Sequence, residues 1–158
     1  MSSSAQRRKP AQSLDELAVW RSIADSWKRV QRGTEKNLMS ADLTLAELRI
    51  LRVLRDQGSS PMNRFSTETM LSQPTITGVV DKLEERRLVE RIRSVQDRRE
   101  VIIAITPKGN EVLAKGEEIH KRFLERSFSG LREGEMETLS VLLKKLADSM
   151  EPRGQFGE

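Results

Sequence analysis

Cysteine and tyrosine are absent from the 158 residues, and the other aromatic side chains amount to two tryptophans and four phenylalanines. Without cysteine there is no disulfide framework and no thiol sensor, so we expect a cytoplasmic protein. Such scarce aromatics leave little material for the base-stacking platforms of single-strand binders. No apolar run approaches the roughly 18 residues that span a membrane, and residues 1–10 lack the apolar core of a secretory signal. We therefore expect no membrane partner.

Features of enzymatic chemistry are also scarce. His120 is the single histidine, and without cysteine it lacks the partners that a zinc site needs. No serine stands in a recognisable nucleophile arrangement, and no glycine-rich phosphate loop is present. The sequence therefore predicts a protein that is not an enzyme and that holds no cofactor and no metal.

The positive charge is modest in total but unevenly distributed. There are 28 Lys and Arg residues against 24 Asp and Glu residues, a net charge of +4. Residues 7–9 are all basic, and residues 91–99 contain four arginines and a single acid. A run of this kind suits nucleic acid, but it also suits an exposed, solvated loop. Charge alone leaves both interpretations open.

Capping signals open the first two predicted helices. An S-x-x-E box at residues 13–16 starts a long amphipathic helix that runs to about Leu38, and a T-x-x-E box at residues 44–47 starts a second. Gly58 is placed to end that second helix. A short helix over residues 61–68 follows with a weaker pattern.

The next predicted helix carries an apolar stripe on one side and small polar residues on the other. Ser72 or Gln73 caps it, and Pro74 lies in its first turn, where proline costs nothing. After Leu88 the period changes: residues 88–93 and 101–105 read as two strands of a hairpin, joined by a polar loop.

Two long helices complete the chain. Thr106 and Pro107 cap a helix that ends near Gly130, and the last helix spans about residues 133–150. Its apolar stripe fits core packing, but a terminal helix needs something to pack on. We therefore expect a dimer interface formed by Leu17, Met136, Leu139, Leu143, Leu146 and Met150.

This order of elements is that of a winged helix–turn–helix. The sequence predicts a mostly α fold with a small two- or three-stranded β-wing and long terminal dimerisation helices. The expected organisation is a disordered basic arm, two segments of a helical dimerisation region, a DNA-binding region between them and a flexible tail: residues 1–12, 13–43 with 107–150, 44–106 and 151–158.

Duplex DNA is the partner that this arrangement favours. A major groove about 12 Å wide admits one helix, whose small and hydrogen-bonding side chains reach base edges. The predicted recognition-helix contacts are Ser72, Gln73, Pro74, Thr75, Thr77, Gly78 and Lys82. The predicted wing contacts are Arg91, Arg93, Asp97, Arg98 and Arg99, since a narrow minor groove attracts arginine.

The stretch from Thr75 to Gly109 resembles the signature of the MarR (multiple antibiotic resistance regulator) family. The matching segments are Thr75-Ile76-Thr77-Gly78, Leu83-Glu84, Leu88-Val89, Asp97-Arg98-Arg99 and Thr106-Pro107-Lys108-Gly109. With the flanking helices, the resemblance covers about residues 14–150. It departs from the family pattern at Arg87, where a small residue is usual and the turn could differ, and at Phe65-Ser66, where the family usually has Leu-Ala.

The resemblance implies a homodimer with intertwined terminal helices that represses transcription from a pseudo-palindromic operator. It also implies release by a small aromatic or anionic effector. The candidate lining residues of the effector pocket are Trp20, Trp27 and Arg49, although tryptophans on such a helix also suit the core. Two other functions stay open. One is a winged-helix module that binds an acidic protein, and the other is a chromatin-like binder indifferent to DNA sequence.

Overall fold

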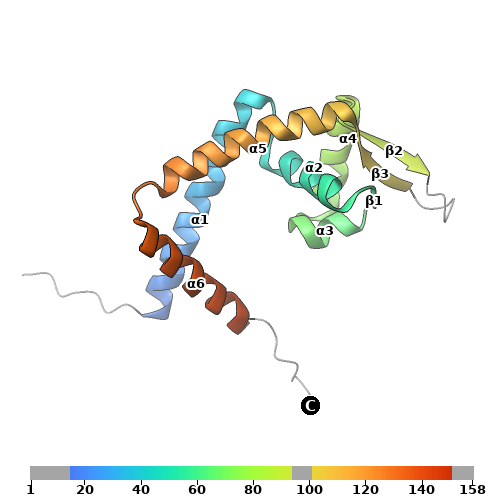
Figure 1. Cartoon of the computed structure of the whole chain (residues 1–158). Coiled ribbons are helices and arrows are strands. Elements are labelled where there is room, and N and C mark those ends of the chain that lie inside the picture. Colours follow the sequence, from blue (N-terminus) through green and yellow to red (C-terminus); the bar gives the residue numbers. More distant parts are fainter. Residues whose placement is uncertain (1–14, 94–100, 151–158) are drawn as a thin grey trace, which may run out of the picture.

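The computed structural model describes residues 15–93 and 101–150, and it shows the mostly helical winged-helix fold that the sequence predicts (Figure 1). In chain order the elements are α1 (Glu16–Leu38), the 3-10 helix η1 (Met39–Ala41), α2 (Leu45–Gln57), β1 (Ser60–Pro61), α3 (Arg64–Thr69), α4 (Gln73–Glu85), β2 (Val89–Arg93), β3 (Val101–Ile105), α5 (Pro107–Phe128) and α6 (Glu133–Met150).

Local capping chemistry sets the helix ends, with one correction. Asp15 caps α1, and its carboxylate accepts the backbone N–H three residues on at 2.6 Å. The predicted box at Ser13 is therefore replaced by Asp15, and Ser13 itself lies outside the described residues. The box of Thr44 and Glu47 at the start of α2 is confirmed, and α2 ends at Gly58, whose φ is +78°.

The sheet has three antiparallel strands in the order β1-β3-β2. Ser60 pairs with Ile103, while Val89 pairs with Ile105, so β3 lies in the middle. The predicted helix over residues 61–68 begins later, at Arg64, because Pro61 belongs to β1 and residues 62–63 form a turn. The hairpin expected from the change of period is confirmed.

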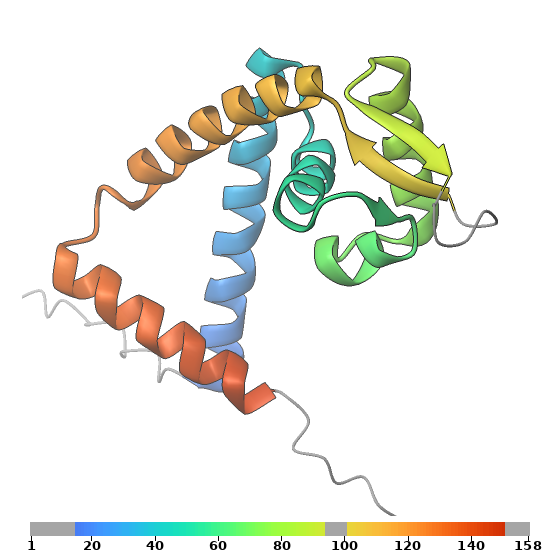
Figure 2. The same cartoon turned by 45° about the vertical axis from the view of Figure 1, so that its right-hand side comes forward.

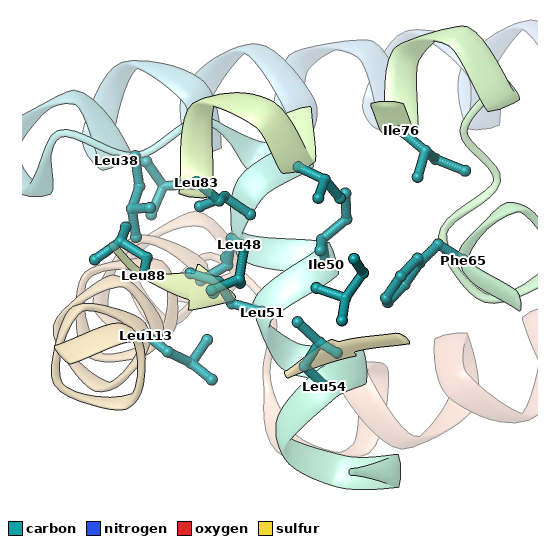
Figure 3. Packing of buried hydrophobic residues seen from close by; sticks show 14 residues of the cluster. Leu38, Leu48, Ile50, Leu51, Leu54, Phe65, Ile76, Leu83, Leu88 and Leu113 are labelled. Carbon is teal, nitrogen blue, oxygen red and sulfur yellow. The ribbon is translucent and has the colours of Figure 1, made fainter. Parts of the chain in front are cut away.

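The hydrophobic core lies inside the winged helix, around α2 (Figure 3). Phe65 from α3, Ile76 from α4 and Leu113 from α5 are fully buried against it. The fully buried residues of α2 itself are Leu48, Ile50, Leu51 and Leu54. This packing fixes which face of α4 points inward and leaves its opposite face free.

Helix α6 stands apart from that core. Figure 2 shows α1, α5 and α6 as an open frame on one side of the molecule, with the winged helix on the other. No residue of α6 is buried, although Met136, Leu139, Leu143 and Leu146 share one of its faces. Among the described residues, none of the helices has the length and apolar character needed to cross a membrane.

Candidate DNA-binding surface

Helix α4 turns its apolar stripe into the core and its polar face outward. Ile76, Val80 and Leu83 are fully buried. The exposed residues include the whole predicted recognition set on this helix and its cap: Ser72, Gln73, Pro74, Thr75, Thr77, Gly78 and Lys82. The structure thus brings these residues together on one surface. The space in front of Gly78 on this surface is open, since a Cβ added there would meet no atom within 4 Å.

The hydroxyl groups on this face are held by local hydrogen bonds. Ser72 Oγ accepts from the backbone N–H of Thr75 at 3.4 Å and lies 2.7 Å from the Thr75 hydroxyl. The Thr77 hydroxyl donates to the Gln73 carbonyl at 3.1 Å. A hydroxyl that is exposed in this way keeps acceptor capacity and can redirect its proton. These side chains can therefore take either role toward a base edge.

The turn between α4 and the wing is left-handed at Arg87, with φ of +58°. The Leu88 N–H bonds to the Leu83 carbonyl at 2.8 Å, and the Arg87 N–H bonds to the Glu84 carbonyl at 2.8 Å. This is the Schellman arrangement that usually places glycine at the left-handed position. The different turn that an arginine there suggested is not found, because burial of Leu83 and Leu88 on either side holds the chain in this conformation.

Arg91 has partners that the sequence analysis did not foresee. Its guanidinium donates to Asp81 at 2.5 Å and to Glu84, and both acids belong to α4. The hydrogen bond with Asp81 raises the pKa of Arg91 above its ordinary value, against the effect of burial. Arg91 thus ties β2 to the recognition helix, whereas Arg93 at the end of the strand is exposed.

The remaining wing residues of the prediction, Asp97, Arg98 and Arg99, lie outside the described residues. A further basic group, Arg64, was not singled out from the sequence. With Asn63 and Thr67 it lines an open surface hollow of about 470 Å³ at the start of α3. A guanidinium, an amide and a hydroxyl are groups that can bind phosphate oxygens.

The predicted effector residues are only partly brought together. The Arg49 guanidinium carbon lies 6.0 Å from the ring centroid of Trp27, a cation–π distance between α2 and α1. Trp20 and Trp27 are 56% and 53% exposed, so neither is a core residue of this chain. Trp20 has no such contact among those found in the described part of the chain.

A hollow of about 660 Å³ opens nearby between α2 and α5, lined by residues other than the predicted ones. Its lining is Arg52, Ala114, Glu117, Glu118, His120, Lys121, Leu124 and Glu125. Burial opposes ionisation of Glu117, but hydrogen bonds from Arg55 and Arg52 outweigh it and lower its pKa. Burial also lowers the pKa of His120, and Arg52 and Arg49 add to this effect. The charges where α2 meets α5 are therefore mixed, because Arg52 and Lys121 stand among three glutamates.

Three comparisons agree on what this chain is similar to. The model of the MarR family matches residues 43–101. The uncharacterized HTH-type transcriptional regulator YkoM of Bacillus subtilis is 32% identical over 82% of this chain and 84% of its own length. The HTH-type transcriptional repressor NicR of Pseudomonas putida is 32% identical over 80% of this chain and 82% of its own length.

The solved structure of BpsR from Bordetella bronchiseptica, whose DNA binding is regulated by 6-hydroxynicotinic acid, superposes with a TM-score of 0.72. That protein is 26% identical, and the match covers 82% of this chain and 98% of the other. The fold and the comparisons place the chain among winged helix–turn–helix transcription regulators that bind DNA. The chain belongs to the MarR family, whose members are DNA-binding regulators and not enzymes.

Proposed function

We propose that this protein is a homodimeric repressor that binds a pseudo-palindromic DNA operator. The observation that carries the proposal is the exposed polar face of α4, which presents the side chains of Gln73, Thr75, Thr77 and Lys82. Between them, Gly78 leaves the helix backbone accessible. Such a face suits base edges and phosphates in the major groove. We further propose that Arg93, Arg98 and Arg99 contact the adjacent backbone or minor groove.

Dimerisation is argued from apolar surface that the single chain leaves uncovered. Leu17 on α1 is 54% exposed, and Leu143 and Met150 on α6 are 43% and 61% exposed. Contiguous exposed apolar patches of this kind mark protein interfaces. We assign residues 13–43 and 107–150 to dimerisation and residues 44–106 to DNA binding. A second copy that covers α1 and α6 would also hold two α4 helices at a fixed spacing.

The test uses duplex fragments that tile the intergenic DNA upstream of the protein's own gene. Fluorescence anisotropy should find a fragment that binds two chains per duplex, resists scrambled competitor and weakens steeply with salt, because binding releases counterions. Equal affinity for every fragment would favour the non-specific binder. No affinity beyond a weak, salt-sensitive background would favour the protein-interaction module.

We further propose that an aromatic acid acts as effector where α1, α2 and α5 meet. Support comes from the Trp27–Arg49 pair between α1 and α2, and from the aromatic acid that regulates the similar protein BpsR. An aromatic ring can stack on tryptophan while its carboxylate pairs with a guanidinium.

The effector proposal is checked with 6-hydroxynicotinic acid as the probe. Saturable quenching of tryptophan fluorescence is expected in the wild type and in Trp20→Phe, and it should be lost in Trp27→Phe. Quenching that persists in Trp27→Phe, or its absence in the wild type, would contradict this site for this class of ligand.

A further inference from the structure

At the C-terminal end of the recognition helix, the side chain of Arg86 contacts two other parts of the protein. Its Nη2 donates to the Asp42 carbonyl at 2.6 Å and lies 3.2 Å from the Asp42 carboxylate. Its Nη1 donates to Glu47 Oε1 at 3.2 Å. Arg86 therefore connects α4 both to the loop after η1 and to the first turn of α2.

The two acceptors of Arg86 are themselves held in place. Glu47 is only 5% exposed, and its second oxygen, Oε2, accepts the Thr44 N–H at 2.7 Å in the capping box of α2. One carboxylate thus caps α2 and binds Arg86 at the same time. Asp42 has φ of +52°, so the backbone conformation of the loop sets where its carbonyl points. A shift of Asp42 or Glu47 would therefore move Arg86 and, with it, the end of α4.

The same junction also reaches both long helices of the dimerisation region. Lys108 on α5 donates to the Arg86 carbonyl at 2.9 Å. Glu35 on α1 accepts the Leu45 N–H at the start of α2 at 2.7 Å. The end of the recognition helix is therefore linked by direct polar contacts to α2 and α5, and through α2 to α1.

The contacts of Arg86 matter for DNA binding because a small tilt of α4 at this end displaces the other end of the helix. Helix α4 has 13 residues and is about 20 Å long, so a tilt of about 5° at Arg86 moves the first turn by roughly 2 Å. The first turn holds Gln73 and Thr75, whose hydrogen bonds to bases tolerate only a few tenths of an ångström. A small change in the angle of α4 at Arg86 therefore decides whether the first turn can form its hydrogen bonds with the bases.

We propose that Arg86 is a positioning residue that sets the angle of α4 against the dimerisation helices, and thereby the spacing of the two recognition helices, without touching DNA. The inference rests on the proposed DNA-binding dimer. It assigns the junction of Arg86 with Asp42 and Glu47 as the place where a change in α1 or α5 reaches the recognition helix.

The experiment compares Arg86→Ala with Arg87→Ala, which removes the same charge from the next residue, whose side chain is exposed. Fluorescence anisotropy measures operator affinity across salt concentrations and for operators with altered half-site spacing. Arg86→Ala should weaken binding about tenfold, the scale of a typical coupling effect. Its salt slope should stay at the wild-type value, since no phosphate contact is lost. Arg87→Ala should retain wild-type spacing preference.

A second variant, Glu47→Gln, tests the same contact in case Arg86→Ala does not fold. Glu47→Gln keeps a side chain that can still cap α2 but removes the charged acceptor of Arg86. It should weaken binding in the same direction while circular dichroism and sedimentation show a folded dimer. The wild-type preference for one spacing should relax in both variants.

Two results would overturn the inference. The first is folded, dimeric variants that bind with unchanged affinity and spacing preference. The second is a salt slope reduced by about one in Arg86→Ala, because such a reduction marks a direct phosphate contact. Wild-type protein that binds no operator would instead refute the proposed function itself. The two failures are thus distinguishable.

Discussion

Replacing Gly78 with alanine should stabilise the fold and weaken DNA binding at the same time. Gly78 is the sixth residue of α4, exposed, with no atom within 4 Å of an added Cβ. Alanine at an exposed helix interior is favoured over glycine by about 0.8–1.0 kcal/mol. For a chain of this size that gain raises Tm by roughly 2–4 °C.

The loss of affinity follows from the position of the new methyl group on the exposed face of α4. It points away from the core on the face that we place in the major groove, where glycine lets the backbone approach the DNA closely. Filling that space should cost about 1–3 kcal/mol of binding, the scale of one well-made base contact.

Thermal unfolding by circular dichroism and operator titration by fluorescence anisotropy measure the two effects on one preparation. Lys115→Ala, at an exposed position of α5, is the control and should change both by only a few tenths of a kcal/mol. A Gly78→Ala protein that is more stable and binds the operator as tightly as the wild type would refute the placement of this face against DNA.

Three further substitutions test other parts of the account. Gly109→Ala should lower stability by at least ~1–3 kcal/mol in a thermal melt, because its Cβ would lie 2.1 Å from the Leu88 carbonyl oxygen. Leu143→Glu should give monomers in sedimentation velocity, since it would place an unpaired charge in the proposed interface. Arg99→Ala should weaken operator binding by ~1–3 kcal/mol and reduce the salt slope by about one.

The first two of these have a matched control. Gly116→Ala should cost less than Gly109→Ala, because its Cβ would meet the ends of leucine side chains and not backbone. Lys144→Glu, beside the apolar stripe of α6, should leave the dimer intact. Equal losses at the two glycines, a dimeric Leu143→Glu protein, or wild-type affinity in Arg99→Ala would each contradict the corresponding assignment.

The helices were predictable because their signals are local. A capping box at Thr44 and Glu47, and proline in the first turn of α4 and α5, act over three or four residues. The apolar stripe of α4 likewise determined which of its residues are exposed. The exposed face of α4 could therefore be predicted from the sequence, whereas its contact with DNA stays a prediction.

What could not be predicted depends on contacts between distant elements. Arg91 meets Asp81 and Glu84 only because β2 returns alongside α4, and Arg86 meets Asp42 only because a left-handed residue turns the loop after η1. The strand β1 has two residues, too few to show a period. These contacts make Arg91 a brace between β2 and the recognition helix, and its contact with DNA stays a prediction.

Protection of operator bases from dimethyl sulfate tests the central claim most directly. This reagent methylates guanine N7 in the major groove and adenine N3 in the minor groove, so it reports which groove α4 enters. We predict two symmetric clusters of protected guanine N7 atoms about one helical turn, ~10 base pairs, apart, as two-fold symmetry of the dimer requires. A single asymmetric cluster, or protection confined to adenine N3, would contradict the account.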